Sequence, residues 1–108
     1  MIRREGACLF VSGPVTLANA AQVLEEGRRF LAEGRRRQDE GVSVVDLGGV
    51  TEMDSALLAL LLAWVRDAQS RERALTFANA PASLSTIARL YGVERLLAGL
   101  DAEAARPH

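Results

Sequence analysis

Hydrophobic residues fall along the chain in short runs, some spaced as in strands and others as in helices. The runs rich in β-forming residues predict strands at residues 7–11, 42–47 and 75–78, with a further short strand at 15–17. Ser12-Gly13-Pro14 predicts a turn after the first run. The run at 42–47 is nearly continuous, which is typical of a strand covered on both faces, and Gly48-Gly49 is expected to end it.

Between these runs, apolar residues recur every three or four positions and predict helices. The expected helices span residues 18–37, 56–69 and 83–91, and one or two helical turns follow at 93–100. Asn19 is the expected N-cap of the first helix and Gly34 its stop, while Gly92 closes the third helix. Alternation of strands and helices predicts an α/β fold with a mixed, mostly parallel sheet and helices packed on it.

Composition agrees with one soluble globular domain. The 108 residues are 49% hydrophobic and 25% charged, and we expect a single domain over residues 1–108. The longest apolar stretch, residues 56–65, is about half of what a bilayer crossing requires. The N-terminal residues lack the apolar run of a secretory signal, and one cysteine suits a reducing compartment, so we expect a cytoplasmic protein.

Charge and residue chemistry argue against several function classes. The formal net charge is −1, so no basic field attracts nucleic acid. His108 is the single histidine and stands at the end of the sequence, where it cannot anchor a catalytic triad or a metal site. Cys8 lies in an apolar run and is expected to be a buried thiol rather than a nucleophile. We therefore expect no enzymatic activity, no cofactor, no metal and no small-molecule substrate.

The most informative segment joins the strand at 42–47 to the helix at 56–69, and it contains Asp54-Ser55-Ala56-Leu57. Asp54 is placed to accept hydrogen bonds from the first backbone N–H groups of that helix, and its charge suits the positive helix end. Ser55 then lies in the first turn, at the carboxyl edge of the sheet, where ligands and partners tend to bind. Asp46 and Asp54 are expected to have structural roles rather than to form an acid/base pair.

The angular positions of residues 55–68 predict how this helix is oriented. Six residues share one broad apolar face, which should lie on the sheet: Leu57, Leu58, Leu61, Trp64, Val65 and Ala68. Ser55, Ala59, Leu62 and Arg66 fall on the opposite side, where the first turns carry small or apolar residues in place of charges. Either a partner protein or another segment of the same chain could cover such a face, and we favour a partner.

A strand, then Asp46-Leu47, a loop, Asp54-Ser55 and a leucine-rich helix together resemble the STAS domain family. Within that family, Leu58-Ala59-Leu60-Leu61-Leu62 and residues 87–93 are similar to MlaB-like subunits of ABC transporters that maintain outer-membrane lipid asymmetry. Family members that act as anti-sigma factor antagonists resemble one another in an Asp-Ser-Ser/Thr-Gly-Leu pattern whose second hydroxyl accepts phosphate. Here Ala56 and Leu57 replace the hydroxyl residue and the glycine, which favours the MlaB-like alternative.

The resemblance implies a regulatory or stabilising subunit that docks on the ATPase of a phospholipid ABC transporter. Such a subunit would lie at the cytoplasmic face of the inner membrane through its partner. The alternative is an anti-sigma factor antagonist that is phosphorylated on Ser55. The expected docking surface is the start of the second long helix with the loop before it, and comprises Thr51, Glu52, Ser55, Ala59, Leu62 and Arg66.

Overall fold

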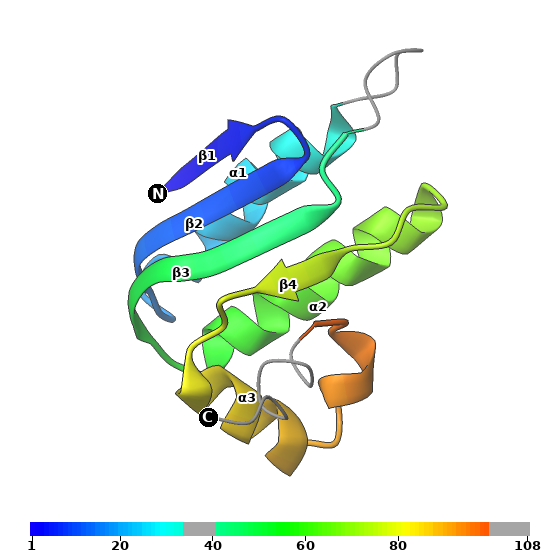
Figure 1. The fold of residues 1–108 in the computed structure, drawn as a ribbon. Coiled ribbons are helices and arrows are strands. Elements are labelled where there is room, and N and C mark those ends of the chain that lie inside the picture. Colours follow the sequence, from blue (N-terminus) through cyan, green and yellow to red (C-terminus); the bar gives the residue numbers. More distant parts are fainter. Residues whose placement is uncertain (34–40, 100–108) are drawn as a thin grey trace.

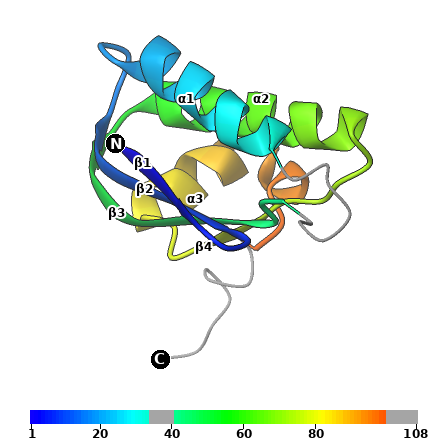
Figure 2. The ribbon, with the colours of Figure 1, turned by 90° about the horizontal axis from the view of Figure 1, so that it is seen from above.

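The computed structural model describes residues 1–33 and 41–99, which form a sheet with the described helices on one of its faces (Figures 1 and 2). The elements in chain order are β1 (Ile2–Glu5), β2 (Cys8–Val15), α1 (Ala20–Ala32), β3 (Val44–Met53), α2 (Ser55–Ser70), β4 (Thr76–Ala78), α3 (Ala82–Leu90) and the short 3-10 helix η1 (Glu94–Leu96). The four strands lie in the order β1-β2-β3-β4. β1 is antiparallel to β2, and the two remaining pairs are parallel, so the predicted mixed, mostly parallel sheet is confirmed.

Strand β1 is absent from the sequence-based prediction. Its residues alternate between half-buried Ile2 and Arg4 and exposed Arg3 and Glu5, as expected of an edge strand with one face on the core. The guanidinium of Arg3 lies 4.8 Å from the ring centroid of Phe10 on β2. Three of the four residues are charged, and charged side chains are a common way to protect a free sheet edge from pairing with other chains.

The residues predicted to break β2 and β3 lie opposite each other inside the sheet. Ser12 pairs with Gly49 and Gly13 with Val50, and register shifts on either side absorb the irregularity. A Cβ atom on Gly49 would lie 2.8 Å from the Cβ of Ser12, so the close approach of the two strands requires glycine there. The predicted turn at Ser12-Gly13-Pro14 and the predicted end of the 42–47 strand are therefore both wrong, because these residues mark irregularities inside two longer strands.

The sheet has one covered and one open face (Figure 2). On β3, Val45 and Leu47 are fully buried under the helices, whereas Val44 and Asp46 on the other face are half-buried. The predicted burial of this strand on both faces is wrong. The run looked continuous because valine occupies an outward position as well as an inward one.

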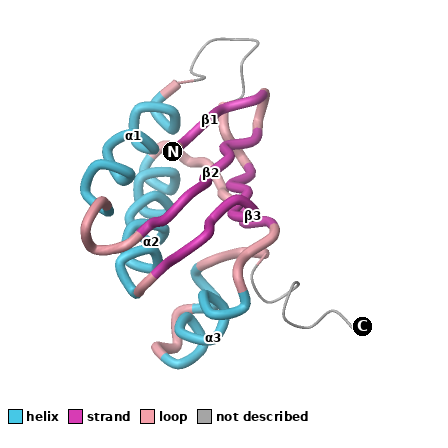
Figure 3. The backbone as a smooth tube through the Cα atoms, turned by 90° about the vertical axis from the view of Figure 1, so that its left-hand side faces the viewer, coloured by secondary structure: helices cyan, strands magenta, loops and turns pink. Residues whose placement is uncertain are grey.

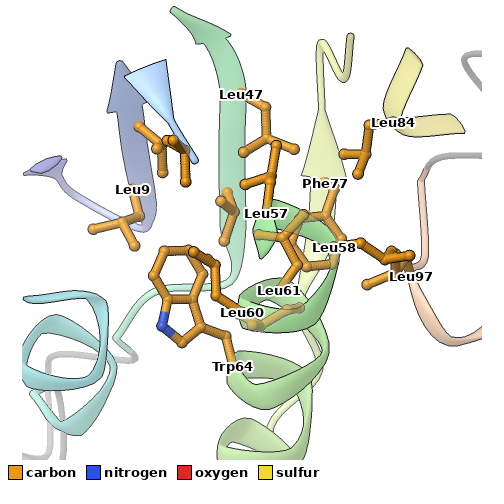
Figure 4. Close-up of a cluster of buried hydrophobic side chains, with 14 of the residues drawn as sticks. Leu9, Leu47, Leu57, Leu58, Leu60, Leu61, Trp64, Phe77, Leu84 and Leu97 are labelled. Atoms are coloured by element: carbon orange, nitrogen blue, oxygen red, sulfur yellow. The ribbon is translucent and has the colours of Figure 1, made fainter. Parts of the chain in front are cut away.

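Helix α2 supplies much of the core, and its predicted orientation holds. Leu57, Leu58, Leu61, Trp64 and Ala68 are buried against the sheet, Val65 is half-buried, and Leu60 is also buried. Figure 4 shows the α2 side chains among Leu9, Leu47 and Phe77 from three strands, with Leu84 and Leu97 closing the cluster from α3 and the segment after η1. Core packing therefore determines which side of α2 faces outward.

Helices α1 and α2 lie side by side and run in the same direction (Figure 3). Gly27 is buried where the two helices meet, and a Cβ atom there would lie 2.0 Å from Cζ2 of Trp64. The indole Nε1 of Trp64 donates a hydrogen bond to the carbonyl of Leu24 at 3.1 Å. Farther along, Nε of Arg28 lies 2.7 Å from Oδ2 of Asp67. Absence of a side chain at Gly27 thus allows the two helices to pack closely.

The predicted helix ends hold in part. Asn19 occupies the N-cap position of α1, but its side chain bonds the preceding turn instead of the helix, accepting from the Thr16 N–H and donating to the Pro14 carbonyl. Gly92 follows α3 with φ of 73°, as a helix-terminating glycine should. The helix α1 ends at Ala32, and the predicted stop at Gly34 lies outside the described residues.

Replacement of a central core leucine tests the orientation of α2. Leu61 is fully buried, so Leu61→Ala should lower the free energy of unfolding by about 2–5 kcal/mol. Leu90→Ala is the matched control, because Leu90 is 76% exposed and its truncation should cost less than about 0.5 kcal/mol. Urea denaturation measures both. Equal effects of the two substitutions would mean that α2 is oriented differently.

A second prediction concerns the contact between α1 and α2. Alanine favours a helix over glycine by about 1 kcal/mol, yet Gly27→Ala should destabilise the protein because its Cβ overlaps the indole of Trp64. We expect a net loss of about 1–2 kcal/mol in urea denaturation. In a Trp64→Phe background the loss should shrink, since the smaller ring leaves room. A stability gain from Gly27→Ala alone would contradict the packing described.

Candidate docking site at the start of helix α2

The carboxylate of Asp54 connects two parts of the chain that are distant in sequence. Its Oδ1 accepts a hydrogen bond from the Ala56 N–H at 2.8 Å and so caps α2, as predicted. Its Oδ2 accepts from the Leu17 N–H at 3.0 Å, which holds the connection between β2 and α1. One side chain therefore fixes the start of α2 and the segment that leads into α1.

Ser55 is the first residue of α2, and its side chain is exposed. Within residues 1–33 and 41–99, its hydroxyl has no hydrogen-bond partner in the structure. The group points outward beside a carboxylate whose two oxygens already accept backbone N–H groups. The hydroxyl is thus available to a partner molecule.

A groove lies between α1 and α2 and begins at these residues. It has a volume of about 450 Å³. The lining residues, which define the α1–α2 groove, are Leu17, Ala20, Ala21, Leu24, Asp54, Ser55, Ala56, Ala59, Leu60 and Ala63. Apart from Asp54 and Ser55 at its start, the lining is apolar. Leu17 stands at the same end and is 81% exposed, so it extends the apolar lining of the groove onto the surface.

The structure brings together some of the predicted site residues and separates others. Ser55 and Ala59 are exposed and line the α1–α2 groove. Arg66 is exposed farther along α2, and Leu62 is half-buried against the core, so both lie outside the groove lining. Thr51 and Glu52 are exposed, but they belong to the end of strand β3 and not to a loop, because β3 continues to Met53.

Sequence reasoning missed the wall of the groove that comes from α1 and the turn before it. Leu17 was assigned to a strand, and Ala20, Ala21 and Leu24 were assigned only to a helix. Three of the four residues in the first turn of α1 (Ala20, Ala21 and Val23) are nevertheless small or apolar, and acidic residues are absent from it, as at the start of α2. Applying the same criterion to both helices would have pointed to the start of α1, but not to Leu17, which precedes the helix.

The carboxylate of Asp46, inside β3, has structural partners. Oδ1 of Asp46 accepts from the Gly48 N–H at 2.8 Å, and Oδ2 accepts from Nδ2 of Asn79 at 3.0 Å. Asp46 therefore ties β3 to the loop after β4, and each aspartate has its own structural role, as predicted. In the part of the chain that the structure describes, there is no group of three or more residues suited to bind a metal ion.

Cys8 is half-buried on the open face of the sheet. The prediction that its thiol is buried is therefore wrong. Desolvation raises the pKa of its thiol, and the nearby carboxylates of Asp46 and Glu5 act in the same direction. A raised pKa leaves less of the nucleophilic thiolate at neutral pH. The local electrostatics thus work against a reactive cysteine.

Comparison with known protein families agrees with this geometry. The family model described as "Mlab, STAS domain" matches residues 1–98, which include the whole sheet, helices α1–α3 and the groove. The chain belongs to the MlaB-like STAS domain family. STAS domains are generally non-catalytic. No curated protein matches the chain.

In the part of this STAS domain that the structure describes, no helix is long and apolar enough to cross a membrane. Its longest helix, α2, has 16 residues and buries one face in the core. On the opposite side of α2, Ser55, Ala59 and Arg66 are exposed.

Two substitutions of Asp54 distinguish the contributions of its two hydrogen bonds to stability. An asparagine retains one oxygen to cap α2, but its amide nitrogen cannot accept from the Leu17 N–H. We expect Asp54→Asn to lower the free energy of unfolding by about 1 kcal/mol and Asp54→Ala by about 1–3 kcal/mol. Urea denaturation would measure both. Identical stabilities of the aspartate and asparagine forms would show that the bond to Leu17 contributes nothing.

Proposed function

We propose that this STAS domain is a non-catalytic subunit that binds and regulates or stabilises the ATPase of an ABC transporter. The transporter would move phospholipids and so maintain outer-membrane lipid asymmetry. The domain would be cytoplasmic, and it would reach the inner membrane through its partner. It would need no cofactor and have no substrate of its own.

The observation that carries this proposal is the outward face of α2 at its first two turns. Ala59 is exposed there, and the groove beside it is lined by alanines and leucines. A helix face that remains in water usually carries charged residues. Small side chains let another backbone approach closely, and covering apolar surface stabilises a complex. Membership of the MlaB-like family supports an ABC-transporter ATPase as the partner.

Ser55 favours a second candidate, an anti-sigma factor antagonist. Its exposed hydroxyl, without a hydrogen-bond partner among the described residues, is accessible to a kinase. Against this stands the motif, since Ala56 occupies the position at which those antagonists resemble one another in a phosphate-accepting hydroxyl. Mass spectrometry of the native protein separates the two: stoichiometric phosphate on Ser55 would favour the antagonist, and unmodified Ser55 the transporter subunit.

The proposal predicts the effect of a long charged side chain on the docking face. Ala59→Arg should leave the domain folded, because the position is exposed. It should weaken binding to the ATPase at least about a hundredfold, or about 3 kcal/mol, because the charge would be buried without a partner. Ser55→Ala should cost about 1–3 kcal/mol if its hydroxyl bonds across the interface. Isothermal titration calorimetry with the purified ATPase measures each dissociation constant.

The matched control is Ala82→Arg. Ala82 is also exposed and also lies near the start of a helix, but it belongs to α3. The Ala82→Arg variant should bind the ATPase with the wild-type dissociation constant. Wild-type affinity of folded Ala59→Arg would contradict the proposed docking face.

A further inference from the structure

We infer that the α1–α2 groove receives an amphipathic helix of the partner, with a large aliphatic side chain of that helix packed against Leu17. This inference rests on the proposed function and adds to it both a wall from α1 and the chemistry of the occupant. It concerns residues on α1 and the preceding turn, which the face of α2 alone does not include.

The shape of the groove suits a helix. Its walls are two helices that run in the same direction, and alanines from both of them line it: Ala20, Ala21, Ala56, Ala59 and Ala63. The groove follows α2 over the nine residues from Ser55 to Ala63, whose eight steps of 1.5 Å span about 12 Å, which matches about two turns of an incoming helix. Beyond Ala63, the indole of Trp64 and the ion pair between Arg28 and Asp67 connect the two helices.

Hydrogen bonding argues for a helical rather than an extended occupant. Past the first turn of each helix, the walls are the sides of helices whose backbone N–H and C=O groups are bonded within the helix, and the free N–H groups of the first turns lie at the starting end of the groove. Polar lining groups occur at one end, where both carboxylate oxygens of Asp54 already accept backbone N–H groups. An extended peptide would bury backbone groups without partners, whereas a helix satisfies its own.

Charges beside the groove define the polarity of the occupant. Glu52 at the end of β3 and Arg66 on α2 are exposed, and neither takes part in an ion pair with another described residue. Glu52 precedes Ser55 by three positions in the chain, and the eleven steps from Ser55 to Arg66 span about 16 Å along α2. A complementary helix would place a basic side chain near Glu52 and an acidic one near Arg66.

Leu17 is positioned before any partner binds. Its side chain is 81% exposed, but its N–H is held by Asp54 at 3.0 Å. Because the backbone at Leu17 is already held, binding there does not have to order it, which favours affinity. Three other residues are also exposed, but they belong to the segment from the end of α3 to η1 and are not part of the groove lining: Leu90, Tyr91 and Leu96.

Titration calorimetry of the 108-residue chain with the purified transporter ATPase tests the inference. Leu17→Asp should weaken binding at least about tenfold, because it places a charge in the apolar contact. Leu90→Asp is the matched control, at a leucine that is 76% exposed, and should bind like wild type. Circular dichroism should show that both variants are folded. Glu52→Arg should also weaken binding, with a larger effect at low salt.

Each outcome has a definite meaning. If Leu17→Asp binds with wild-type affinity while Ala59→Arg does not bind, the groove inference is overturned and the proposed function stands. If the wild-type chain does not bind the ATPase, both fail. Hydrogen–deuterium exchange of the complex tests the occupant itself: the ATPase segment that becomes protected should be helical, and a protected segment in an extended conformation would overturn the inference.

Discussion

The close contact of α1 with α2 at Gly27 and Trp64 is the constraint on which the rest of the surface depends. Because Gly27 has no side chain, the indole of Trp64 packs against the backbone of α1 and donates a hydrogen bond to the Leu24 carbonyl. Toward the start of both helices, alanines replace this bulky contact. The helices are therefore held together near their middle, and an apolar groove remains between their first turns.

Asp54 links this architecture to the proposed function. In sequence it is the acidic residue of the family motif, and in the structure it is the N-cap of α2. Its second oxygen holds Leu17 at the mouth of the groove. The same residue thus orders both walls of the surface that we propose as the docking site, so the motif makes structural sense without a chemical reaction.

The sequence was sufficient to predict the mixed, mostly parallel sheet, the orientation of α2 and the cap at Asp54, since each depends on local patterns and burial. It was insufficient for contacts between distant segments. Ser12-Gly13 and Gly49 looked like chain breaks because only the structure pairs them across two strands. Leu17 looked like part of a strand because its partner, Asp54, lies 37 positions away. Leu17 was missed as part of the groove for that reason.

The central claim is that a partner covers the groove side of this STAS domain. Hydroxyl-radical footprinting tests it directly, because leucine and tyrosine side chains are oxidised in proportion to their exposure. With the transporter ATPase bound, the account predicts strong protection of Leu17 and unchanged oxidation of Leu90, Tyr91 and Leu96, which are all exposed in the free domain. Unchanged oxidation of Leu17 together with protection of Leu90 and Tyr91 would contradict it.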